Sequence, residues 1–526
     1  MLPPMLPPIP SPSPWWSAAA IAVYFAFMLF IGYMAFRRTR NLGDYMLGGR
    51  QLPPAVAALS AGAADMSGWL LMGLPGALYL SGLVQAWIAI GLTIGAWCNW
   101  YFVAPRLRSY TEVAGDSITI PTFLDRRFSD GTHALRTVSG IVILLFFTFY
   151  VSSGMVASGT FMQSTFGMKP WIGILIVGGI TLLYTTFGGF LGATWTDVAQ
   201  GLLMLAALVV VPIIAIVRMG GWSNVASAIA QIDASSGGHH FSFIAGATVM
   251  GVISAVAWGL GYFGQPHIIV RFMALKTPQA ATFGRRVGIS WMILISVGAC
   301  ASGVIGRAYF GDELLPTDDA PTKHETVFLA LSEAFFHPFI AGLVLSAVLA
   351  AIMSTLSSQL IVCSSALIED LLKLFNRNLP KNREVLAGRL GVVVVAVVAA
   401  ILAFTSSDTI LNLVGFAWAG FGASFGPVIL LSLYWKRLTN WGAFSGIAVG
   451  AATVVIWGKT HFEAWLQDHV LAPIGIHVTE HLYEIVPGFV MCLLVAIVVS
   501  VLSKAPSPQI VAEFDEAKKL ASHKMV

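Results

Sequence analysis

An aspartate lies in the middle of a hydrophobic stretch, where a charged side chain is rare. Residues 54–82 read PAVAALSAGAADMSGWLLMGLPGALYLSG, with small and polar residues clustered around Asp65. At 1.5 Å per residue, the segment from Pro54 to Asp65 would bring this carboxylate about 16 Å into a bilayer, near its midplane and deeper than any other acid. Placing a charged side chain at this depth costs about 2.5–3.5 kcal/mol on insertion scales. We therefore expect Asp65 to have a partner or to lie beside an aqueous cavity. A carboxylate capping the free N–H groups of a broken helix is the alternative, and a break would itself expose backbone groups that bind ions and anionic solutes.

A second stretch offers neutral oxygen ligands on one helix face. In LAAIMSTLSSQL, residues 349–360, Ala351, Ser354 and Thr355 stand at positions i, i+3 and i+4. Sodium is a hard cation that binds several hydroxyl and carbonyl oxygens, and these residues with the carbonyls of a broken helix would supply them. Hydroxyls that bond back to their own helix or to a neighbouring helix are the alternative.

Aromatic residues and glycines are interspersed in a third stretch. Residues 254–267 read SAVAWGLGYFGQPH, where Trp258 and Tyr262 project from one helix face beside three glycines that favour an unwound segment. With Tyr150 and Trp69, they could line a pocket for a small organic solute. A place in the aromatic belt at the membrane interface is the alternative, and Phe263 fits it better.

The composition requires most of the surface to face lipid. Hydrophobic residues make up 57% of the 526 residues and charged residues 10%, against about 25% charged in an ordinary soluble domain. We therefore expect an all-α polytopic membrane protein. The basic residues form no long run interleaved with aromatics, so a nucleic-acid partner is not expected. The four cysteines have neither metal-site nor disulfide spacing and are expected to pack as small hydrophobes: Cys98, Cys300, Cys363 and Cys492.

Hydrophobic segments of about 20 residues predict thirteen membrane spans. A proline-rich arm over residues 1–14 would precede a transmembrane domain over 15–503, and a charged tail over 504–526 would follow it. The predicted spans are roughly 15–36, 54–80, 83–104, 137–160, 171–187, 196–217, 243–263, 287–310, 337–363, 388–405, 410–434, 440–458 and 485–503.

The distribution of basic residues predicts the orientation. If the N-terminus is outside, five of the 29 Lys and Arg remain outside and 24 fall on the cytoplasmic side, as the positive-inside rule favours. The C-terminus is then cytosolic. The cytoplasmic set includes Arg37, Arg38, Arg40, Arg106, Arg108, Arg126, Arg127, Arg271, Arg285, Arg286, Arg389, Lys436 and Arg437, and the outer set is Lys169, Arg218, Arg307, Lys323 and Lys459.

Two glycine-interrupted helices suggest an internal repeat. The spans at 54–80 and 243–263 would each open a set of five helices, and an odd number of spans per set inverts the topology. We expect inverted repeats over about 54–217 and 243–434, although no residue-level self-similarity is visible.

Long motifs in the chain resemble the sodium:solute symporter family, and within it the branch that carries L-proline. The likeness runs from about Ala20 to Pro506, and glycine, tryptophan and polar positions agree together. The motifs are YMLGGR (45–50), LSAGAADMSGWLLMGLPGA (59–77), ILLFFTFY (143–150), STFGM (164–168), GGFLGATWTD (188–197), WGLGYFGQPHI (258–268), STLSSQLIVCSSALIEDL (354–371), AWAGFGASFGPV (417–428) and IVPGF (485–489).

The resemblance implies a LeuT-type core of inverted five-helix repeats and a role for particular residues. It implies sodium ligands at Ala63, Met66, Ala351, Ser354 and Thr355, with Asp65 close by. It implies solute contacts at Ser67, Gly68, Trp69, Tyr150, Trp258 and Tyr262. It links Arg50 and Asp197 to coupling; for these two, the positive-inside rule and a helix N-cap are the structural alternatives.

The expected function is transport without covalent chemistry. A sodium-coupled symporter would import L-proline across a bacterial cytoplasmic membrane by alternating access; its partners would be proline, Na⁺ and the lipid bilayer, and it would be no enzyme and need no cofactor. Alternatives are a symporter for a monocarboxylate, pantothenate or a sugar, a proton-coupled carrier using Asp65, and a transporter-like solute sensor. The short segment after residue 504 is expected to be too small for a signalling domain.

Overall fold

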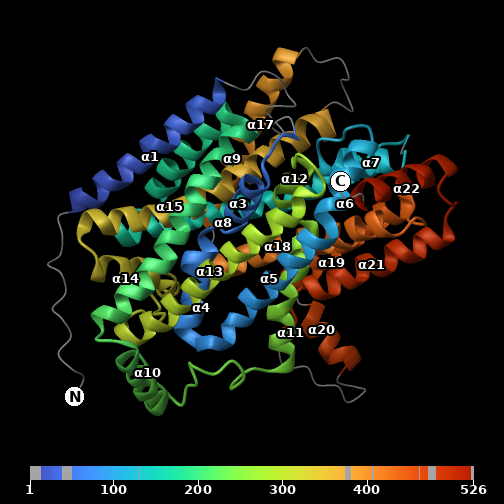
Figure 1. The fold of residues 1–526 in the computed structure, drawn as a ribbon. Helices are drawn as coiled ribbons and strands as arrows, with labels where there is room; N and C mark the ends of the chain where they lie inside the picture. Colours follow the sequence, from blue (N-terminus) through green and yellow to red (C-terminus); the bar gives the residue numbers. More distant parts are fainter. Residues whose placement is uncertain are drawn as a thin grey trace.

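The computed structural model describes residues 14–37, 50–129, 131–372, 381–405, 408–460, 462–471 and 481–522. Within these residues the secondary structure is helical apart from isolated bridges, and the helices form one bundle (Figure 1). Nearly all of the predicted arm, together with Arg38 and Arg40, lies outside the described residues.

Short 3-10 and π segments, labelled η, interrupt the succession of α-helices along the chain. The first part of the chain contains α1 (Pro14–Phe36), α3 (Pro54–Asp65), η2 (Trp69–Gly73), α4 (Leu74–Ser81), η3 (Gly82–Gln85), α5 (Ala86–Cys98), η4 (Asn99–Val103), α6 (Ala104–Val113), α7 (Ile120–Arg127), α8 (Ala134–Phe166), α9 (Pro170–Arg218) and α10 (Trp222–Ser236). The second part contains α11 (Val249–Ala257), η5 (Trp258–Gly264), α12 (Pro266–Met273), α13 (Ala280–Phe310), η6 (Lys323–Thr326), α14 (Val327–Phe335), α15 (Pro338–Ser365), η7 (Ala366–Leu372), α17 (Lys381–Thr405), α18 (Ile410–Tyr434), α19 (Asn440–Lys459), α20 (Phe462–Leu466), η8 (Gln467–Leu471), α21 (Ile485–Leu502) and α22 (Pro508–Ser522).

Ten helical segments in the described residues are long and apolar enough to cross a membrane. Pro170–Arg218 covers the predicted spans 171–187 and 196–217, whereas Trp69–Val113 covers the predicted span 83–104 and only the second half of 54–80. The predicted span at 243–263 corresponds to the shorter apolar helix Val249–Gly264. The number thirteen therefore stays a prediction.

The chain reverses direction inside α9. As a straight helix its 49 residues would be about 74 Å long, but Gly189 has a φ of 58° and interrupts the helix. A Cβ on Gly192 would lie only 3.9 Å from the Tyr184 carbonyl oxygen, where a straight helix would separate them by about 12 Å. The two predicted spans in this region thus form a hairpin.

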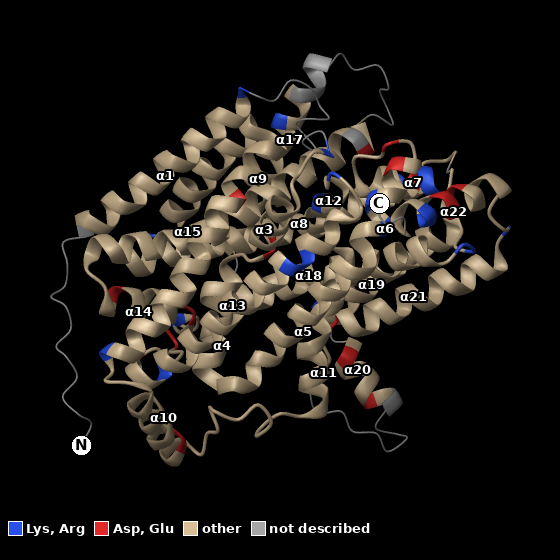
Figure 2. Cartoon of the chain, in the orientation of Figure 1, with Lys and Arg blue, Asp and Glu red and all other residues tan. Residues whose placement is uncertain are grey.

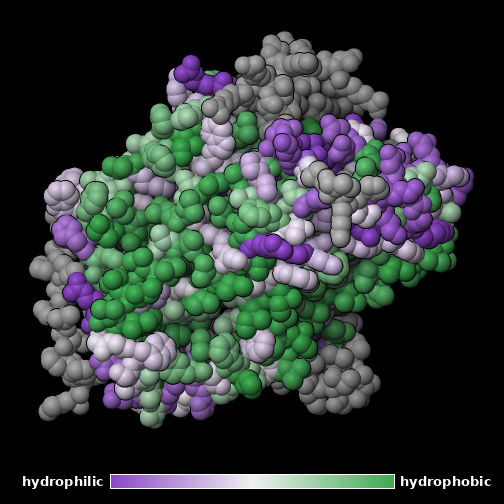
Figure 3. Space-filling model, in the orientation of Figure 1, coloured by the Kyte–Doolittle hydropathy of each residue, from purple (hydrophilic) through white to green (hydrophobic). Residues whose placement is uncertain are grey.

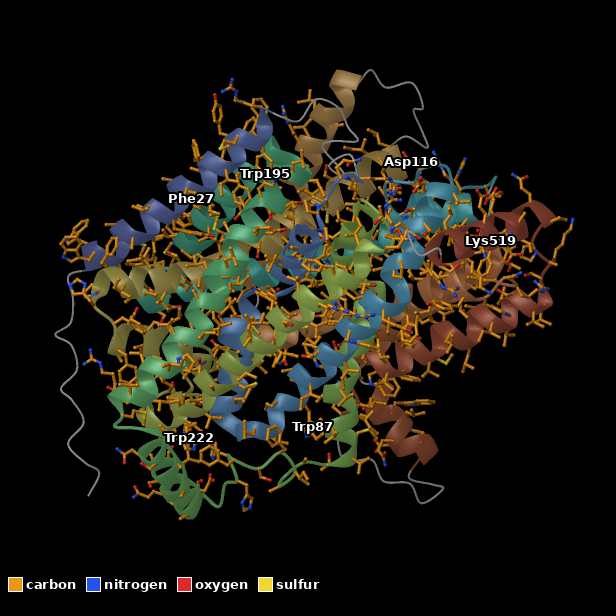
Figure 4. All side chains as sticks on the ribbon, viewed as in Figure 1. Phe27, Trp87, Asp116, Trp195, Trp222 and Lys519 are labelled. Carbon is orange, nitrogen blue, oxygen red and sulfur yellow. The ribbon has the colours of Figure 1, made fainter. Side chains whose placement is uncertain are left out.

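The two ends of the bundle differ in charge. The first turn of α1 lies at the same end as α10 and α14, and α6, α7 and α22 lie at the opposite end (Figure 1). Basic residues, with acidic ones among them, gather around α6, α7 and α22 (Figure 2), and the sides of the bundle between the ends are broadly hydrophobic (Figure 3). Trp87 and Trp222 lie at the α10 end, whereas Asp116 and Lys519 lie at the α22 end (Figure 4).

Two helices are interrupted inside the core of the bundle. The α3 helix ends where the Met66 N–H donates to the Gly62 carbonyl at 3.0 Å, and Met66 leaves helical geometry with φ −80° and ψ 80°. The η5 segment separates α11 from α12, and Gly261 is required there because an added Cβ would lie 1.9 Å from the Trp418 indole nitrogen of α18. Both breaks leave backbone groups without intrahelical partners. The division into inverted repeats remains a prediction.

The buried acid Glu325 packs against α4, the half-helix that follows the first break. Glu325 of η6 is 2% exposed, and its carboxylate accepts a hydrogen bond of 2.9 Å from the Ile410 N–H at the start of α18. The backbone of Glu325 lies against Gly76 of α4, where a Cβ would come within 3.0 Å. Burial raises the pKa of Glu325 to about 7, against the opposing effect of the α18 N–H groups.

This shift predicts a pH dependence of stability. A carboxyl whose pKa is raised on folding stabilises the fold fully below its unfolded pKa of 4.5, and this contribution is lost as the pH rises through 7. It amounts to roughly 3 kcal/mol at most. We expect the melting temperature of the purified protein to fall between pH 5 and 8, and Glu325→Gln to flatten this dependence. The exposed acid Glu313 provides the control: Glu313→Gln should leave the slope unchanged, and equal slopes in all three proteins would contradict the assignment.

Candidate functional site

Neutral oxygens converge where α15 passes the end of α3. The Ser354 hydroxyl lies 2.7 Å from the Ala63 carbonyl oxygen and 3.1 Å from that of Ala351. The Thr355 hydroxyl lies 3.2 Å from the Ala351 carbonyl oxygen, and all four residues are buried. The structure thus brings four of the five implied sodium ligands together; the fifth, Met66, is buried at the end of α3. Hydroxyl and carbonyl oxygens in this arrangement can hold a hard monovalent cation.

The Asp65 carboxylate links the two interrupted helices. It accepts a short hydrogen bond from the Tyr262 hydroxyl of η5, while its Oδ1 is buried without a partner among the described residues. A cavity of about 20 Å³ adjoins it between α3, α5 and α13, enough for one water-sized particle. The carboxylate therefore has both features expected of an intramembrane acid, a partner and a small cavity.

Aromatic rings from several helices lie over the break. The Trp69 and Trp258 ring centroids are 6.4 Å apart, and Trp258 stacks on Tyr483 at 5.2 Å. The Trp418 indole N–H donates to the Trp258 carbonyl at 2.7 Å and so fixes η5 against α18. Gly68 lies close to α8 and α15, since a Cβ there would be 2.9 Å from that of Ala157.

The Tyr150 hydroxyl points into the same region. It is buried, and it lies near enough to Ser67, Asp65 and Tyr262 to interact with them electrostatically. Ser67, also buried, follows Met66 in the break. The structure therefore places the six implied solute contacts around one helix break.

A cavity of about 450 Å³ lies against these aromatics, with Trp258 and Tyr483 in its lining. Charged residues of both signs also line it. Gly251, Ser254 and Ala255 of α11 and Lys459 at the end of α19 belong to the same lining. The charged lining residues are Asp408, Lys459 and Glu484, with His481 beside them.

A buried ion pair lies one helical turn further along α15. Arg271 of α12 bonds Asp197 of α9 at 3.1 Å, the Ser358 hydroxyl at 2.6 Å and the Ser60 hydroxyl at 3.2 Å, and it also donates to the His267 carbonyl. Ser60 donates to the same Asp197 oxygen at 2.6 Å. Arg271 and Asp197 are 1% and 0% exposed.

This cluster corrects two interpretations of the sequence. The N-cap alternative for Asp197 is wrong, because the residue lies inside α9 and its carboxylate pairs with Arg271. Arg271 is not a surface residue of a cytoplasmic loop, because the bonds to α3, α9 and α15 hold it in the core.

Arg50 ties together three segments at the α6 end of the bundle. It forms an ion pair with Asp116 at 2.8 Å and donates to the Ser117 carbonyl at 2.6 Å, the Met273 carbonyl at 3.0 Å and the Thr111 hydroxyl at 3.1 Å. The positive-inside rule alone does not explain this many partners.

The sequence analysis missed residues that complete the site. Ser358 could have been found, since it lies four residues after Ser354 on the same helix face. Trp418 could have been found from its glycine-rich motif, which packs closely on the glycines of η5. Arg271 and Tyr483 carry no local signal, because their partners come from distant segments.

The model of the sodium:solute symporter family matches residues 45–450. The chain is 54% identical over 490 residues to the high-affinity proline transporter PutP of Bacillus subtilis, covering 93% of this chain and 98% of the relative. It is 48% identical to the osmoregulated proline transporter OpuE of the same organism, with coverages of 96% and 98%. It is 45% identical to a sodium/proline symporter of Staphylococcus aureus, with 97% of each chain covered.

Solved structures agree in fold. A Na⁺-coupled sialic acid symporter in a substrate-bound outward-open state superposes with a TM-score of 0.76 at 20% identity, covering 94% of this chain and 99% of the other. The nucleobase-cation-symport-1 family transporter Mhp1 superposes with a TM-score of 0.52 at 15% identity, covering 91% and 99%. The chain therefore belongs to the sodium:solute symporter family: it is a multi-pass membrane transporter with a LeuT-type fold, and not an enzyme.

Proposed function

We propose that the protein is a sodium-coupled symporter that imports L-proline across a bacterial cytoplasmic membrane by alternating access. The observation that carries this proposal is the neutral oxygen site formed by Ala63, Ala351, Ser354 and Thr355 directly beside an aromatic-covered helix break. Three relatives with at least 45% identity are named for proline transport.

The chemistry of the break suits a small amino acid with an apolar ring. Backbone N–H groups around Ser67 and Gly68 would receive the solute carboxylate, as helix breaks do in transporters. Trp258 and the hydroxyl-bearing Tyr150 would cover the ring and attract the ammonium group, for about 0.5–2 kcal/mol per aromatic contact. A hexose would require more side-chain amides, because an unpaired buried hydroxyl costs about 1–3 kcal/mol. Gln265, the amide that directly follows η5, already donates to the Trp418 carbonyl at 3.1 Å.

Sodium would couple to the solute through the position of α3. A cation bound by Ala63 of α3 and Ser354 of α15 would hold the break against α15 and so stabilise the completed solute pocket. Occupancy then shifts the population toward the solute-binding arrangement. Each charge that moves inward adds about 2.3 kcal/mol per 100 mV of membrane potential.

We also propose the orientation with the N-terminus outside and the α22 tail in the cytosol. The gathering of basic residues around α6, α7 and α22 supports it (Figure 2). In this orientation the cavity above Trp258 faces the outside and the Asp197–Arg271 pair lies on the cytoplasmic side of the sodium site. The inverted repeats over about 54–217 and 243–434 belong to the same proposal.

Uptake of labelled L-proline into proteoliposomes tests the function. An inward sodium gradient should drive accumulation, and unlabelled proline should compete while glucose, galactose, pantothenate and lactate should not. Accumulation driven by a proton gradient without sodium, or competition by one of the other solutes, would move the protein to another branch of the family.

The sodium ligands predict a graded loss of sodium affinity. Ser354→Ala and Thr355→Ala each remove one oxygen from the cation shell, and a lost bond to a charged group costs about 1.5–3 kcal/mol. We therefore expect the sodium concentration for half-maximal uptake to rise tenfold or more in each variant. Ser346→Ala is the matched control, because Ser346 is buried on the same helix and bonds only back to the Gly342 carbonyl. Unchanged sodium activation in both variants would show that these hydroxyls contribute to helix packing and not to cation binding.

Truncating the aromatic cover should affect the solute more than the cation. Trp258→Ala removes the ring that lies over the break and stacks on Tyr483. We expect the proline concentration for half-maximal uptake to rise about tenfold, with sodium activation changed less than threefold. Trp97, on the exposed surface of α5, provides the control variant Trp97→Ala. Equal effects on proline and sodium would argue against a solute contact.

A further inference from the structure

A further buried carboxylate lies beyond the ion pair, at the cytoplasmic end of α15 in the proposed orientation. Asp370 of η7 is fully buried. Its Oδ1 lies 3.0 Å from the Thr119 hydroxyl, 3.1 Å from the Thr122 hydroxyl and 3.3 Å from the Arg136 guanidinium. Its Oδ2 is buried without a partner among the described residues. Burying a carboxylate oxygen without a hydrogen-bond or cation partner costs free energy, so this oxygen needs a partner in some state of the protein.

A cavity lies between this carboxylate and the ion pair below the sodium site. Its lining includes Arg271 and Ser358 of the ion-pair cluster together with Asp370 and Thr119. Its volume of about 20 Å³ can hold one water-sized particle. Apart from Ser365, the other lining residues are apolar: Ile118, Ile120, Pro121, Ile143, Phe190, Pro266, Val270, Ile361 and Val362.

Polar groups on α15 mark the same route. Ser354 lies at the sodium site, Ser358 lies four residues later at the ion pair, and Ser365 lines the cavity next to η7. Both polar atoms of Gln359 are buried without partners among the described residues. The π segment η7 then brings Asp370 to the N-terminal end of α7, where Thr119 is the N-cap. Local π segments often occur at functional sites.

We propose that Asp370, with the hydroxyls of Thr119 and Thr122, forms a transient cation site through which the coupling ion leaves toward the cytoplasm. The inference rests on the proposed sodium symport and on its orientation. In the structure, the Arg136 guanidinium pairs with the carboxylate through Oδ1 at 3.3 Å. A departing cation would be received by the free Oδ2, and the hydroxyl oxygens, which are hard ligands, would complete its shell. The negative charge of Asp370 would lower the energy barrier that the apolar walls of the cavity present to a cation.

The site makes opposite predictions for its two charges. Asp370→Asn removes the negative charge with little change in shape, so the cation should leave more slowly and rebind more weakly from the cytoplasmic side. Arg136→Gln removes the competing positive charge, so the cation should rebind more tightly from that side. A purely structural ion pair would give changes in the same direction in both variants, because each leaves one buried charge unpaired.

The test uses right-side-out membrane vesicles that contain the full chain. For Asp370→Asn we expect the net rate of sodium-driven proline uptake to fall about tenfold while external half-saturation by sodium stays within twofold of the parent. Proline exchange with saturating sodium on both sides should stay within twofold, since sodium need not leave. Inhibition of net uptake by luminal sodium should require at least fivefold more sodium in Asp370→Asn and at least threefold less in Arg136→Gln.

Controls separate this inference from folding defects and from the proposed function. Equilibrium binding of labelled proline with external sodium checks that each variant folds, and Asp370→Glu should restore part of the net rate. Asp125→Asn removes another buried acid at the same end, outside the cavity lining, and should leave luminal inhibition unchanged. Parent vesicles without sodium-stimulated proline uptake would defeat the proposed function. With an active parent, net uptake and exchange lowered equally in Asp370→Asn, or shifts of luminal inhibition in the same direction in both variants, would overturn the cation site.

Discussion

Asp65→Asn is expected to abolish sodium-driven uptake at sodium concentrations that saturate the parent protein. The carboxylate follows Ala63, whose carbonyl joins the cation site, by two residues. At an effective dielectric constant of 20, opposite charges about 10 Å apart attract by roughly 1.7 kcal/mol, more than a tenfold effect on affinity. The amide would also change the bond to Tyr262, which joins α3 to η5. Sodium titrations of proline uptake and of proline binding measure the loss.

Two further variants separate charge from hydrogen bonding. Asp65→Glu keeps the charge in a longer side chain and should retain some uptake. Tyr262→Phe keeps the ring packed on Trp418 at 5.1 Å and removes only the donor, so it should lose about 1.5–3 kcal/mol of cation binding while transport persists at high sodium. Parent-like sodium dependence in Asp65→Asn would exclude the carboxylate from cation binding.

Local patterns in the chain predicted the elements that interrupt the helices. The small residues around Asp65 predicted a helix break at 66–68, and the glycines after Trp258 predicted one in η5. Glycine destabilises the middle of a helix, because it loses more conformational freedom on folding than other residues do. The i, i+3 and i+4 spacing of Ala351, Ser354 and Thr355 predicted one polar face, and the structure turns that face toward Ala63.

Pairings between distant segments could not be predicted in the same way. From its charge alone, Arg271 is assigned to the cytoplasmic side. Only the folded structure shows that α3, α9 and α15 surround it with hydrogen-bond partners. The interaction of Tyr483 with Trp258 spans more than 200 residues of sequence. At α9, by contrast, the sequence predicted two spans, 171–187 and 196–217, and Gly189 reverses the chain between them.

The buried pair of Arg271 and Asp197 should be among the most sensitive positions of the chain. Removing one partner leaves an uncompensated buried charge, which costs about 3–5 kcal/mol. We expect Arg271→Gln and Asp197→Asn each to lower the melting temperature in detergent and to abolish net uptake. Arg271→Lys should also fail, because a single ammonium group cannot reproduce the separate bonds to Asp197, Ser358, Ser60 and the His267 carbonyl.

The double variant Asp197→Asn, Arg271→Gln distinguishes a charge pair from two independent contacts. If the pair acts as a unit, the double variant should be more stable than the sum of the single losses predicts, because neither charge is left alone. Its stability should recover more than its uptake, since the ion pair also closes the path below Ser354 on the cytoplasmic side in the proposed orientation. Arg285→Gln is the control, since Arg285 contacts exposed rings of α5 and η4 by cation–π interactions only. Strictly additive losses would show that Arg271 acts through its hydroxyl and carbonyl partners rather than through Asp197.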